Sequence, residues 1–368
     1  MRVCVITPGF ASDEHDECIP ALRDFVLALS QGHQVTVVAL RYPHHTEPYR
    51  IGAVDVLPIG AKQSAGLGRL RLLAKAKNTI EKAGPFDVFH GFWADEPGWL
   101  AQHCASKAKA VSIVSLMGGE FAEFKTQGYG GMLSLANRVL QRRAISRATL
   151  VTAGSKWLQR LASGQARRQV SLLPLGVALP QDAVTARSHL KAPLRIAAIG
   201  SMVAIKGFDS LIEGCAKAHD QGVDLHLSMF GDGPLRTNLE KLATARNVPT
   251  KWFGHLPRRE VLRRLGEIDL VLQGSLWESQ GMAIVEAAWA GCAVAGTQVG
   301  TLDELEHRYG EFAPMNTEQI ATLIEGASLD PQGLIDSGRA LQLEVAKSHS
   351  MAKALEQWET VIAAAGSI

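Results

Sequence analysis

The chain has 368 residues, 46% of them apolar and 20% charged, with a net charge of +2, which indicates a globular protein long enough for two cores. No stretch reaches the roughly 18 to 20 uninterrupted apolar residues of a membrane span, and the opening sequence, MRVCVITPGF, is typical of a strand rather than a signal peptide. Five scattered cysteines without a CxxC pair argue against a disulfide framework or a zinc site, so we expect a cytoplasmic protein.

The first half of the chain alternates between strand and helix patterns. Residues 2–7 form a short apolar run, residues 21–29 carry apolar side chains at helical spacing, and residues 34–40 form a second apolar run. A strand, a helix and a strand in so short a length predict a parallel sheet with a right-handed crossover. Further strands are expected at residues 54–59, 87–91, 111–116, 150–152 and 171–175. We therefore predict one doubly wound α/β domain over residues 1–180.

The pattern restarts after residues 181–191, a polar stretch typical of a linker. We expect strands at 194–199, 225–230, 251–253, 270–272 and 293–296, with helices near 209–218, 234–245, 259–265 and 281–289. These elements predict a second doubly wound domain over residues 181–349. A C-terminal helix over residues 350–368 is a candidate to cross back to the first domain. Open sheets of this kind bind ligands beyond the carboxyl ends of their strands, and two facing domains would form a cleft.

The most informative segment is GSLWESQGMAIVEAAWAGCAVAGTQVG, residues 274–300. Glu278 lies in a predicted turn, Gly281 opens a helix, and Glu286 follows eight residues after Glu278, about 10–12 Å away along a helix axis. Carboxylates accept hydrogen bonds from sugar hydroxyls, and the amides of residues 279–282 at a helix N-terminus suit a diphosphate. The alternative is an ordinary buried strand–helix unit with two unremarkable glutamates.

This segment resembles the E-x7-E signature of the retaining glycosyltransferase family 4, whose members have the B-type fold of two Rossmann-like domains. The stretches IGSMVAIKGFD at residues 199–209 and FGDGPL at residues 230–235 resemble further motifs of the family, as do DVFH at 87–90 and LPLGV at 173–177. The resemblance implies that Glu278 and Lys206 are catalytic and that the second domain binds the nucleotide sugar. The implied donor-binding residues are Gly9, Ser201, Lys206, Gly231, Gly233, Glu278, Ser279, Gly281, Met282 and Glu286.

The sequence departs from the family pattern at three places. Ser201 occupies the position of a diphosphate-binding arginine, the loop after Gly9 is acidic and lacks a Gly-Gly pair, and Met117 replaces a histidine near the reacting sugar. Glu120 directly follows the pair Gly118 and Gly119 and is a candidate to take over a sugar contact. The alternative for Glu120 is a loop carboxylate in water.

We expect the acceptor to bind the first domain, with His90, Trp93 and Glu120 as candidate contacts. An aromatic ring beside carboxylates suits a sugar, although Trp93 packed under its loop and a structural His90 are equally consistent with the sequence.

Positive charge is concentrated in the first domain. Residues 1–180 carry a net charge of +8 and residues 181–368 a net charge of −6. Apolar residues alternate with cations over residues 61–82, a pattern of helices that lie on anionic membranes, and a solvated basic face is the alternative. We expect peripheral association with the inner face of a membrane. No nucleic acid partner is expected, because no nucleic-acid module is present.

The sequence therefore predicts a hexosyltransferase that uses a UDP- or GDP-linked sugar, retains configuration, acts on a glycan or lipid-linked acceptor and needs no cofactor or metal. One alternative keeps the fold but is a weak or inactive nucleotide-sugar-binding partner protein. A second alternative, a hinged two-domain binding protein of the periplasmic type, is disfavoured by the missing signal peptide and by the Glu278 and Glu286 pair.

Overall fold

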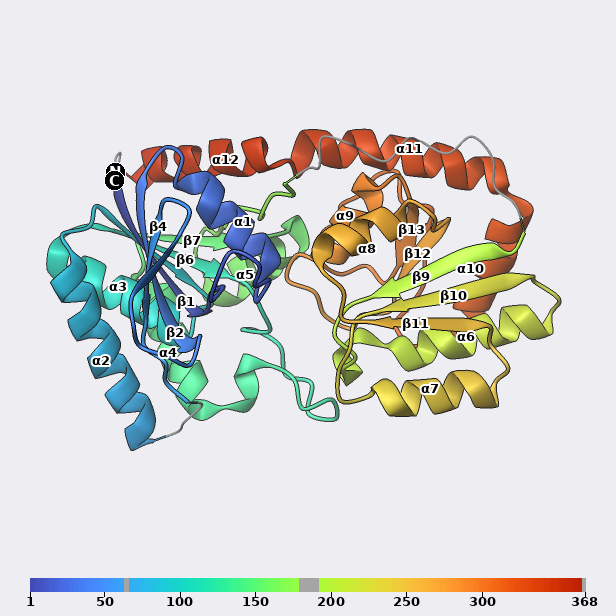
Figure 1. Cartoon of the computed structure of the whole chain (residues 1–368), viewed down its shortest axis with the longest axis horizontal. Helices are drawn as coiled ribbons and strands as arrows, with labels where there is room; N and C mark the ends of the chain where they lie inside the picture. Colours follow the sequence, from blue (N-terminus) through green and yellow to red (C-terminus); the bar gives the residue numbers. More distant parts are fainter. Residues whose placement is uncertain (63–65, 179–191, 366–368) are drawn as a thin grey trace. The chain divides into compact units, whose positions relative to one another are not determined.

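The computed structural model describes residues 1–62, 66–178 and 192–365, which form two compact units (Figure 1). The N-terminal unit contains residues 1–178 together with the C-terminal helix from Met351, and the second unit contains the residues up to Ser350. Within the described ranges, no helix is both long and apolar enough to cross a membrane.

The N-terminal unit is built on an eight-stranded sheet with the order β3-β4-β2-β1-β5-β6-β7-β8. The strands are β1 (Arg2–Gly9), β2 (Gln34–Tyr42), β3 (Tyr49–Ile51), β4 (Val54–Pro58), β5 (Val88–Phe92), β6 (Val111–Leu116), β7 (Leu150–Ala153) and β8 (Ser171–Leu172). All neighbours are parallel except β3 and β4, which form an antiparallel hairpin at one edge. The central strands are covered on both faces, which explains their continuous apolar runs.

Helices connect these strands as crossovers. They are α1 (Pro20–Leu29), α2 (Leu67–Ala83), α3 (Glu96–Ala108), the short η1 (Gly131–Leu133), α4 (Leu135–Arg147) and α5 (Lys156–Ala166). In α1, Leu22, Phe25, Val26 and Leu29 are buried because they share one helical face. Ser134 and Ser155 cap the first turns of α4 and α5 with their hydroxyl groups.

The last helix, α12 (Met351–Ala365), belongs to the N-terminal unit and packs against α1. Trp358 has no exposed surface, and its indole N–H donates to Nδ1 of His90 over 3.4 Å. On the same helix, Glu359 lies 2.6 Å from Nε2 of His33. The expected return of the C-terminal helix to the first domain is therefore confirmed.

The second unit has a six-stranded, fully parallel sheet with the order β11-β10-β9-β12-β13-β14. Its strands are β9 (Leu194–Ile199), β10 (Leu225–Phe230), β11 (Thr250–Gly254), β12 (Leu270–Gln273), β13 (Ala293–Gly296) and β14 (Gly310–Glu311). In sequence order this is 3-2-1-4-5-6, the doubly wound Rossmann arrangement. The strand order reverses between β9 and β12, and ligands of such sheets bind at the carboxyl ends next to that point.

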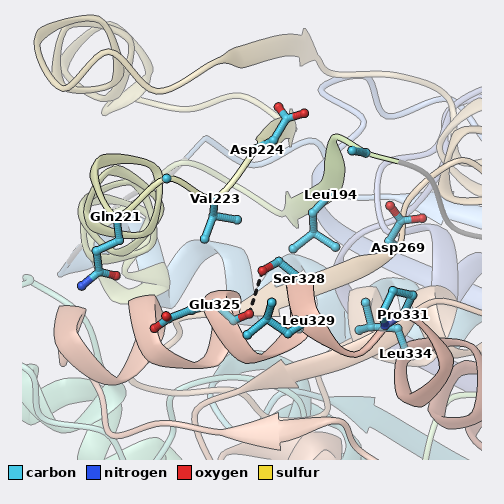
Figure 2. Close-up of a pocket in the computed structure, with 13 residues that line it drawn as sticks. Leu194, Gln221, Val223, Asp224, Asp269, Glu325, Ser328, Leu329, Pro331 and Leu334 are labelled. Atoms are coloured by element: carbon cyan, nitrogen blue, oxygen red, sulfur yellow. Dashed lines mark hydrogen bonds between the residues drawn. The ribbon is translucent and has the colours of Figure 1, made fainter.

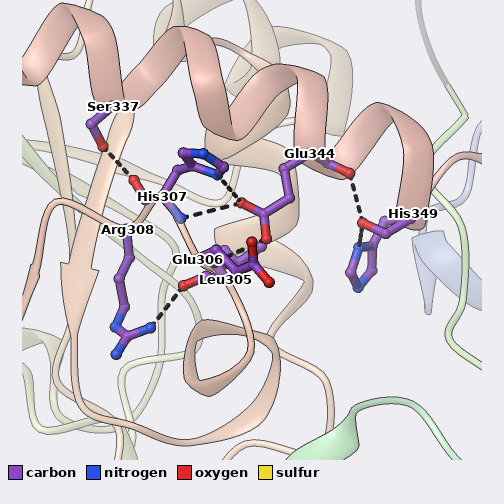
Figure 3. A network of polar contacts seen from close by, with 8 residues as sticks. Leu305, Glu306, His307, Arg308, Ser337, Glu344 and His349 are labelled. Carbon is purple, nitrogen blue, oxygen red and sulfur yellow. Dashed lines mark hydrogen bonds and ion pairs between the residues drawn. The ribbon is translucent and has the colours of Figure 1, made fainter.

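The helical elements of this unit are η2 (Ala204–Lys206), α6 (Phe208–Asp220), α7 (Arg236–Ala245), α8 (Arg258–Leu265), α9 (Met282–Trp289), η3 (Gly300–Asp303), α10 (Thr317–Leu329) and α11 (Pro331–Ser348). Figure 3 shows how α11 is fixed to the segment after η3. Glu344 accepts hydrogen bonds from the backbone N–H groups of Glu306 and His307, and Ser337 donates to the carbonyl of His307.

Candidate active site

Lys206 and Glu278 meet at the point where the strand order of the second unit reverses. Lys206 ends η2, which follows β9, and Glu278 follows β12, the neighbouring strand. Nζ of Lys206 lies 2.5 Å from Oε1 of Glu278, and the hydroxyl of Ser275 donates to the same oxygen over 2.7 Å. The lysine and glutamate side chains are 25% and 13% exposed, so the pair is partly buried but open to a ligand.

A glycine makes this close approach feasible. Gly207, directly after Lys206, has φ +62°, and a Cβ added there would lie 2.3 Å from the carbonyl oxygen of Gly274. Only glycine fits such a left-handed position against another backbone. The lysine–glycine pair thus brings the end of η2 onto the segment after β12.

The N-terminus of α9 lies in the same segment. Gly281 adopts φ +82° directly before Met282, the first residue of the helix, and the partly buried Ser279 precedes it. The first amides of a helix have no partner within it, and the helix dipole favours negative charge at this end. Glu278, Ser279, Gly281 and Met282 therefore lie together where a diphosphate would be stabilised.

Glu286 lies farther along α9 and is paired with a cation that the sequence analysis missed. Oε1 of Glu286 accepts a hydrogen bond of 2.8 Å from Nε of Arg258, the first residue of α8. The two side chains are 13% and 10% exposed. Because Arg258 precedes Glu286 by 28 residues in an unremarkable RREV context, no spacing rule identified it.

The turn after β10 packs closely on the segment after β9. A Cβ at Gly231 would lie 2.1 Å from the carbonyl oxygen of Gly200, and one at Gly233 would lie 2.7 Å from the amide of Met202. The side chain of Met202 is fully buried, whereas Ser201 is exposed. The glycines of the FGDGP turn thus bring two backbones together at the carboxyl edge, and Ser201 faces solvent there.

A cavity of this unit lies at the other edge of the sheet. It measures about 370 Å³ and is lined at the amino ends of β9, β10 and β12 by Leu194, Asp224 and Asp269, with Glu325 of α10 beside them (Figure 2). Its carboxylates would repel a diphosphate. We therefore assign the candidate donor site to the carboxyl edge that carries Lys206 and Glu278.

In the N-terminal unit, Gly9 is buried at the end of β1, where an added Cβ would lie 3.2 Å from Sγ of Cys18. The acidic loop that follows is held by Asp16, which accepts hydrogen bonds of 2.7 Å from the Tyr42 hydroxyl and 2.8 Å from Ser12. These hydrogen bonds lower the pKa of Asp16 against the raising effect of its burial. The loop therefore has a defined conformation without the Gly-Gly pair of the family.

Glu120 is buried and organises the loop after β6. Its carboxylate accepts hydrogen bonds from the backbone N–H groups of Ala94, Met117 and Gly118 over 3.3, 3.0 and 2.9 Å. Burial raises its pKa, and the backbone donors counteract that effect. The alternative of a solvated loop glutamate is therefore wrong.

Trp93 lies beside this loop in an uncommon backbone conformation. Its φ is +72°, a left-handed value that a bulky residue adopts only under constraint, and a Cβ at Gly118 would lie 2.9 Å from its Nε1. Trp93 is partly exposed. It is thus fixed at the carboxyl end of β5 with part of its ring available to a ligand.

Four charged residues near Trp93 were not singled out together from the sequence. The carboxylate of Glu96 accepts from Arg41 and pairs with Arg69 at 2.7 and 2.8 Å. Burial, followed by the nearby charges of Glu96 and Glu120, raises the pKa of Asp95 to about 7. These side chains come from three separate elements, so only the fold brings them together.

His90 is a structural residue, which corrects our expectation of an acceptor contact. The side chain has no exposed surface, its ring stacks on Phe92 with centroids 4.1 Å apart, and Nε2 lies 2.7 Å from the Ser115 hydroxyl. Because Nδ1 accepts from Trp358, Nε2 carries the proton and the ring is neutral. Burial lowers the pKa of His90 to about 3. An acceptor cannot reach it.

Among the described residues, no three His, Cys, Asp or Glu side chains gather as a metal site.

Models of known protein families match both units of the chain. A model described as a glycosyl transferase 4-like domain matches residues 22–176, and a model of glycosyl transferases group 1 matches residues 186–337. The chain belongs to the family 4-like glycosyltransferases. The resemblance found in the E-x7-E segment is thereby confirmed.

Curated relatives of this chain are distant. The chain is 25% identical to a 2-deoxystreptamine glucosyltransferase of Streptomyces kanamyceticus over 58% of the chain and 64% of the relative, and 26% identical to the putative glycosyltransferase EpsF of Bacillus subtilis over 60% of each. A GDP-mannose-dependent alpha-(1-6)-phosphatidylinositol dimannoside mannosyltransferase of Mycobacterium tuberculosis is 30% identical over 36% of each chain. The chain thus spans less than two thirds of the length of these relatives.

Solved structures confirm the fold of this chain. Sucrose-phosphate synthase from Thermosynechococcus elongatus superposes with a TM-score of 0.77 at 16% identity and 99% coverage of both chains. Anabaena HepE in complex with UDP-glucose gives a TM-score of 0.74 at 18% identity and full coverage of both chains. WaaG, a glycosyltransferase involved in lipopolysaccharide biosynthesis, gives 0.72 at 16% identity over 98% of this chain and 99% of that one. The predicted B-type fold, with two parallel-sheet α/β domains, is therefore confirmed.

Proposed function

We propose that the protein transfers a hexose from a UDP- or GDP-linked sugar to a glycan or lipid-linked acceptor, with retention of configuration. The observation that carries this proposal is the Lys206–Glu278 pair beside the α9 N-terminus, at the reversal point of a Rossmann sheet. Retention is supported by the resemblance to family 4, and the hexose by the glucosyltransferase and the mannosyltransferase among the relatives of the chain.

Each donor group has a matching partner in the second unit. Lys206 and the amides from Ser279 to Met282 would stabilise the diphosphate, and its charge grows as the bond to the sugar breaks. Glu278 would accept hydrogen bonds from the transferred sugar, and Glu286 from the ribose. Gly231 and Gly233 hold the turn after β10 against the segment after β9, at the edge where the nucleotide would bind. Ser201 offers a hydroxyl where the family usually has an arginine.

We propose that this reaction needs no bound metal, because Lys206 and the α9 N-terminus supply positive charge to the leaving group. Transfer in the presence of excess EDTA should equal transfer in its absence. A rate that falls with EDTA and returns with Mg²⁺ would contradict this proposal.

The acceptor would bind the N-terminal unit beside Trp93, with Glu120 shaping the loop next to it. A partly exposed indole can stack on a sugar ring. Trp93→Ala should raise KM for the acceptor and leave donor hydrolysis unchanged. An equal loss in both reactions would point to a structural role for the ring.

We also propose that the N-terminal unit contacts anionic membrane. The exposed apolar side chains of Leu133, Leu135 and Val139 lie on η1 and α4, beside Arg138 and Arg142 of α4. Apolar residues among cations suit the surface of an anionic bilayer. Sedimentation with phosphatidylglycerol vesicles but not phosphatidylcholine vesicles, weakened by salt, would support this partner.

Calorimetric titration with UDP, GDP and ADP, followed by hydrolysis of the matching sugar donors, tests the main proposal. Binding of UDP or GDP with slow release of sugar supports a transferase and identifies the base. Binding without release, even when sugar and lipid acceptors are supplied, would favour a nucleotide-sugar-binding partner protein. No binding to any nucleotide would contradict the proposed donor site.

A further inference from the structure

Glu286 is held by a cation from a neighbouring helix. Arg258 begins α8, and its Nε donates to Oε1 of Glu286 on α9 over 2.8 Å. Both side chains are about nine-tenths buried, with 10% and 13% of their surface exposed. The guanidinium is planar and permanently charged, so its hydrogen bond also fixes the direction of the carboxylate.

This arrangement has a specific consequence for ligand binding. A glutamate side chain has several rotatable bonds, and each must be restricted before the carboxylate can hold a sugar hydroxyl. A partly buried carboxylate without a cation is also stabilised by taking up a proton, after which it accepts hydrogen bonds poorly. Arg258 holds the Glu286 carboxylate in one orientation and places a cation beside it, so neither cost arises when the ligand binds.

Glu278 and Glu286 differ in the cation that holds each carboxylate. The partner of Glu278 is Lys206, which is itself assigned to the diphosphate and has 25% of its side chain exposed. Arg258 is more deeply buried, and no donor group has been assigned to it. Lys206 would therefore change partners on binding, whereas Arg258 would remain with Glu286.

We propose that Arg258 is a positioning residue for the nucleotide ribose, acting through the Glu286 carboxylate. This inference rests on the proposed function of Glu286 as the ribose ligand. A purely structural role, tethering α8 to α9, would alter stability but not the recognition of ribose hydroxyls.

The test measures ribose recognition directly. Wild type, Arg258→Ala, Glu286→Ala and the double variant are titrated calorimetrically with UDP and GDP and with their 2′-deoxy and 3′-deoxy forms. We expect wild type to prefer a ribonucleotide over at least one deoxy form. Arg258→Ala should weaken ribonucleotide binding about tenfold and remove most of that preference, and the double variant should bind no more weakly than Glu286→Ala.

Two further variants control for folding and for charge. Arg259→Ala removes the adjacent, exposed arginine of α8 and should bind like wild type. Arg258→Lys keeps the charge without the planar donor geometry and should restore part of the ribose preference. It also provides a folded variant if the alanine variant is unstable in thermal melts.

The outcomes distinguish failure of the positioning role from failure of the proposed function. If Arg258→Ala and Arg258→Lys keep the full ribose preference while Glu286→Ala loses it, the positioning role is overturned and the proposed function stands. A wild type that binds nucleotide without any ribose preference also overturns the inference. If wild type binds no nucleotide, the proposed function fails together with it.

Discussion

Lys206 and Glu278, both assigned to the donor, are bonded to each other across the ends of β9 and β12, with Nζ 2.5 Å from Oε1. Each side chain is thus oriented toward the other at the carboxyl edge of the sheet. A bound diphosphate would replace Glu278 as the partner of Lys206. The Glu278 carboxylate could then accept hydrogen bonds from sugar hydroxyls. The pair neutralises two opposite charges that would otherwise be partly buried alone.

Replacing Lys206 by alanine should weaken nucleoside diphosphate binding by about 1–3 kcal/mol, the usual loss for a hydrogen bond to a charged group. Binding of the nucleoside alone should change little, because it carries no diphosphate. Calorimetry of both ligands measures the difference. Lys217→Ala, which removes a surface lysine of α6 paired with Glu318, is the matched control. Equal affinity in the Lys206 variant and wild type would contradict the assignment.

Replacing Gly231 by alanine should destabilise the second unit by more than about 2 kcal/mol, since it adds a Cβ 2.1 Å from the Gly200 carbonyl at φ +117°. Gly222→Ala is the control, because Gly222 also has a positive φ, +93°, but its Cβ would meet nothing within 4 Å. Urea denaturation gives both free energies. Similar losses in the two variants would show that backbone strain, rather than the close approach, dominates.

The stability of the N-terminal unit should fall below about pH 6.5 because of His90. Its folded pKa of about 3 lies below the ordinary value of 6.5, so between these values the unfolded chain binds the extra proton and stability decreases as pH decreases. At pH 5 the expected loss from this residue is about 2 kcal/mol. Denaturant titrations at pH 7 and pH 5 measure it. His90→Asn should reduce the dependence, whereas His15→Asn, at an exposed site, should not.

Asp95 makes the stability of the protein depend on pH in the opposite direction to His90. Its folded pKa of about 7 exceeds the ordinary value of 3.8, so the folded protein binds the extra proton, and stability decreases as pH rises between these values. Asp95→Asn should therefore stabilise the protein by up to about 4 kcal/mol at pH 8 and by about 2 kcal/mol at pH 5. Asp13→Asn, at an exposed position, is the control. A stabilisation that does not vary with pH would rule out this cause.

The central strands of both sheets could be predicted because parallel strands buried on both faces appear as apolar runs, whereas the short edge strands β3 and β14 were missed. Helices α10 and α11 were missed in the stretch before the C-terminal helix. Their exposed faces carry apolar residues such as Leu329 and Leu343, which obscure the helical period, although Asp330 and Pro331 form a recognisable helix start.

Site residues that share one segment could be predicted, and partners from separate segments could not. The motif placed Glu278, Gly281 and Glu286 on one strand–helix unit, as the structure shows. Arg258 and the Asp95 cluster depend on packing between helices and strands that no local spacing encodes. The burial of His90 depends on Trp358, 268 residues away.

The contact between His90 and Trp358 also affects the order in which the protein can be completed. Strand β5 is among the first third of the chain to be synthesised, but α12, which covers the His90 side chain, comes after the whole second unit. A growing chain must therefore hold the N-terminal sheet with this face uncovered until synthesis of the second unit has ended. The unit that contains the first strand is therefore completed only by the last helix.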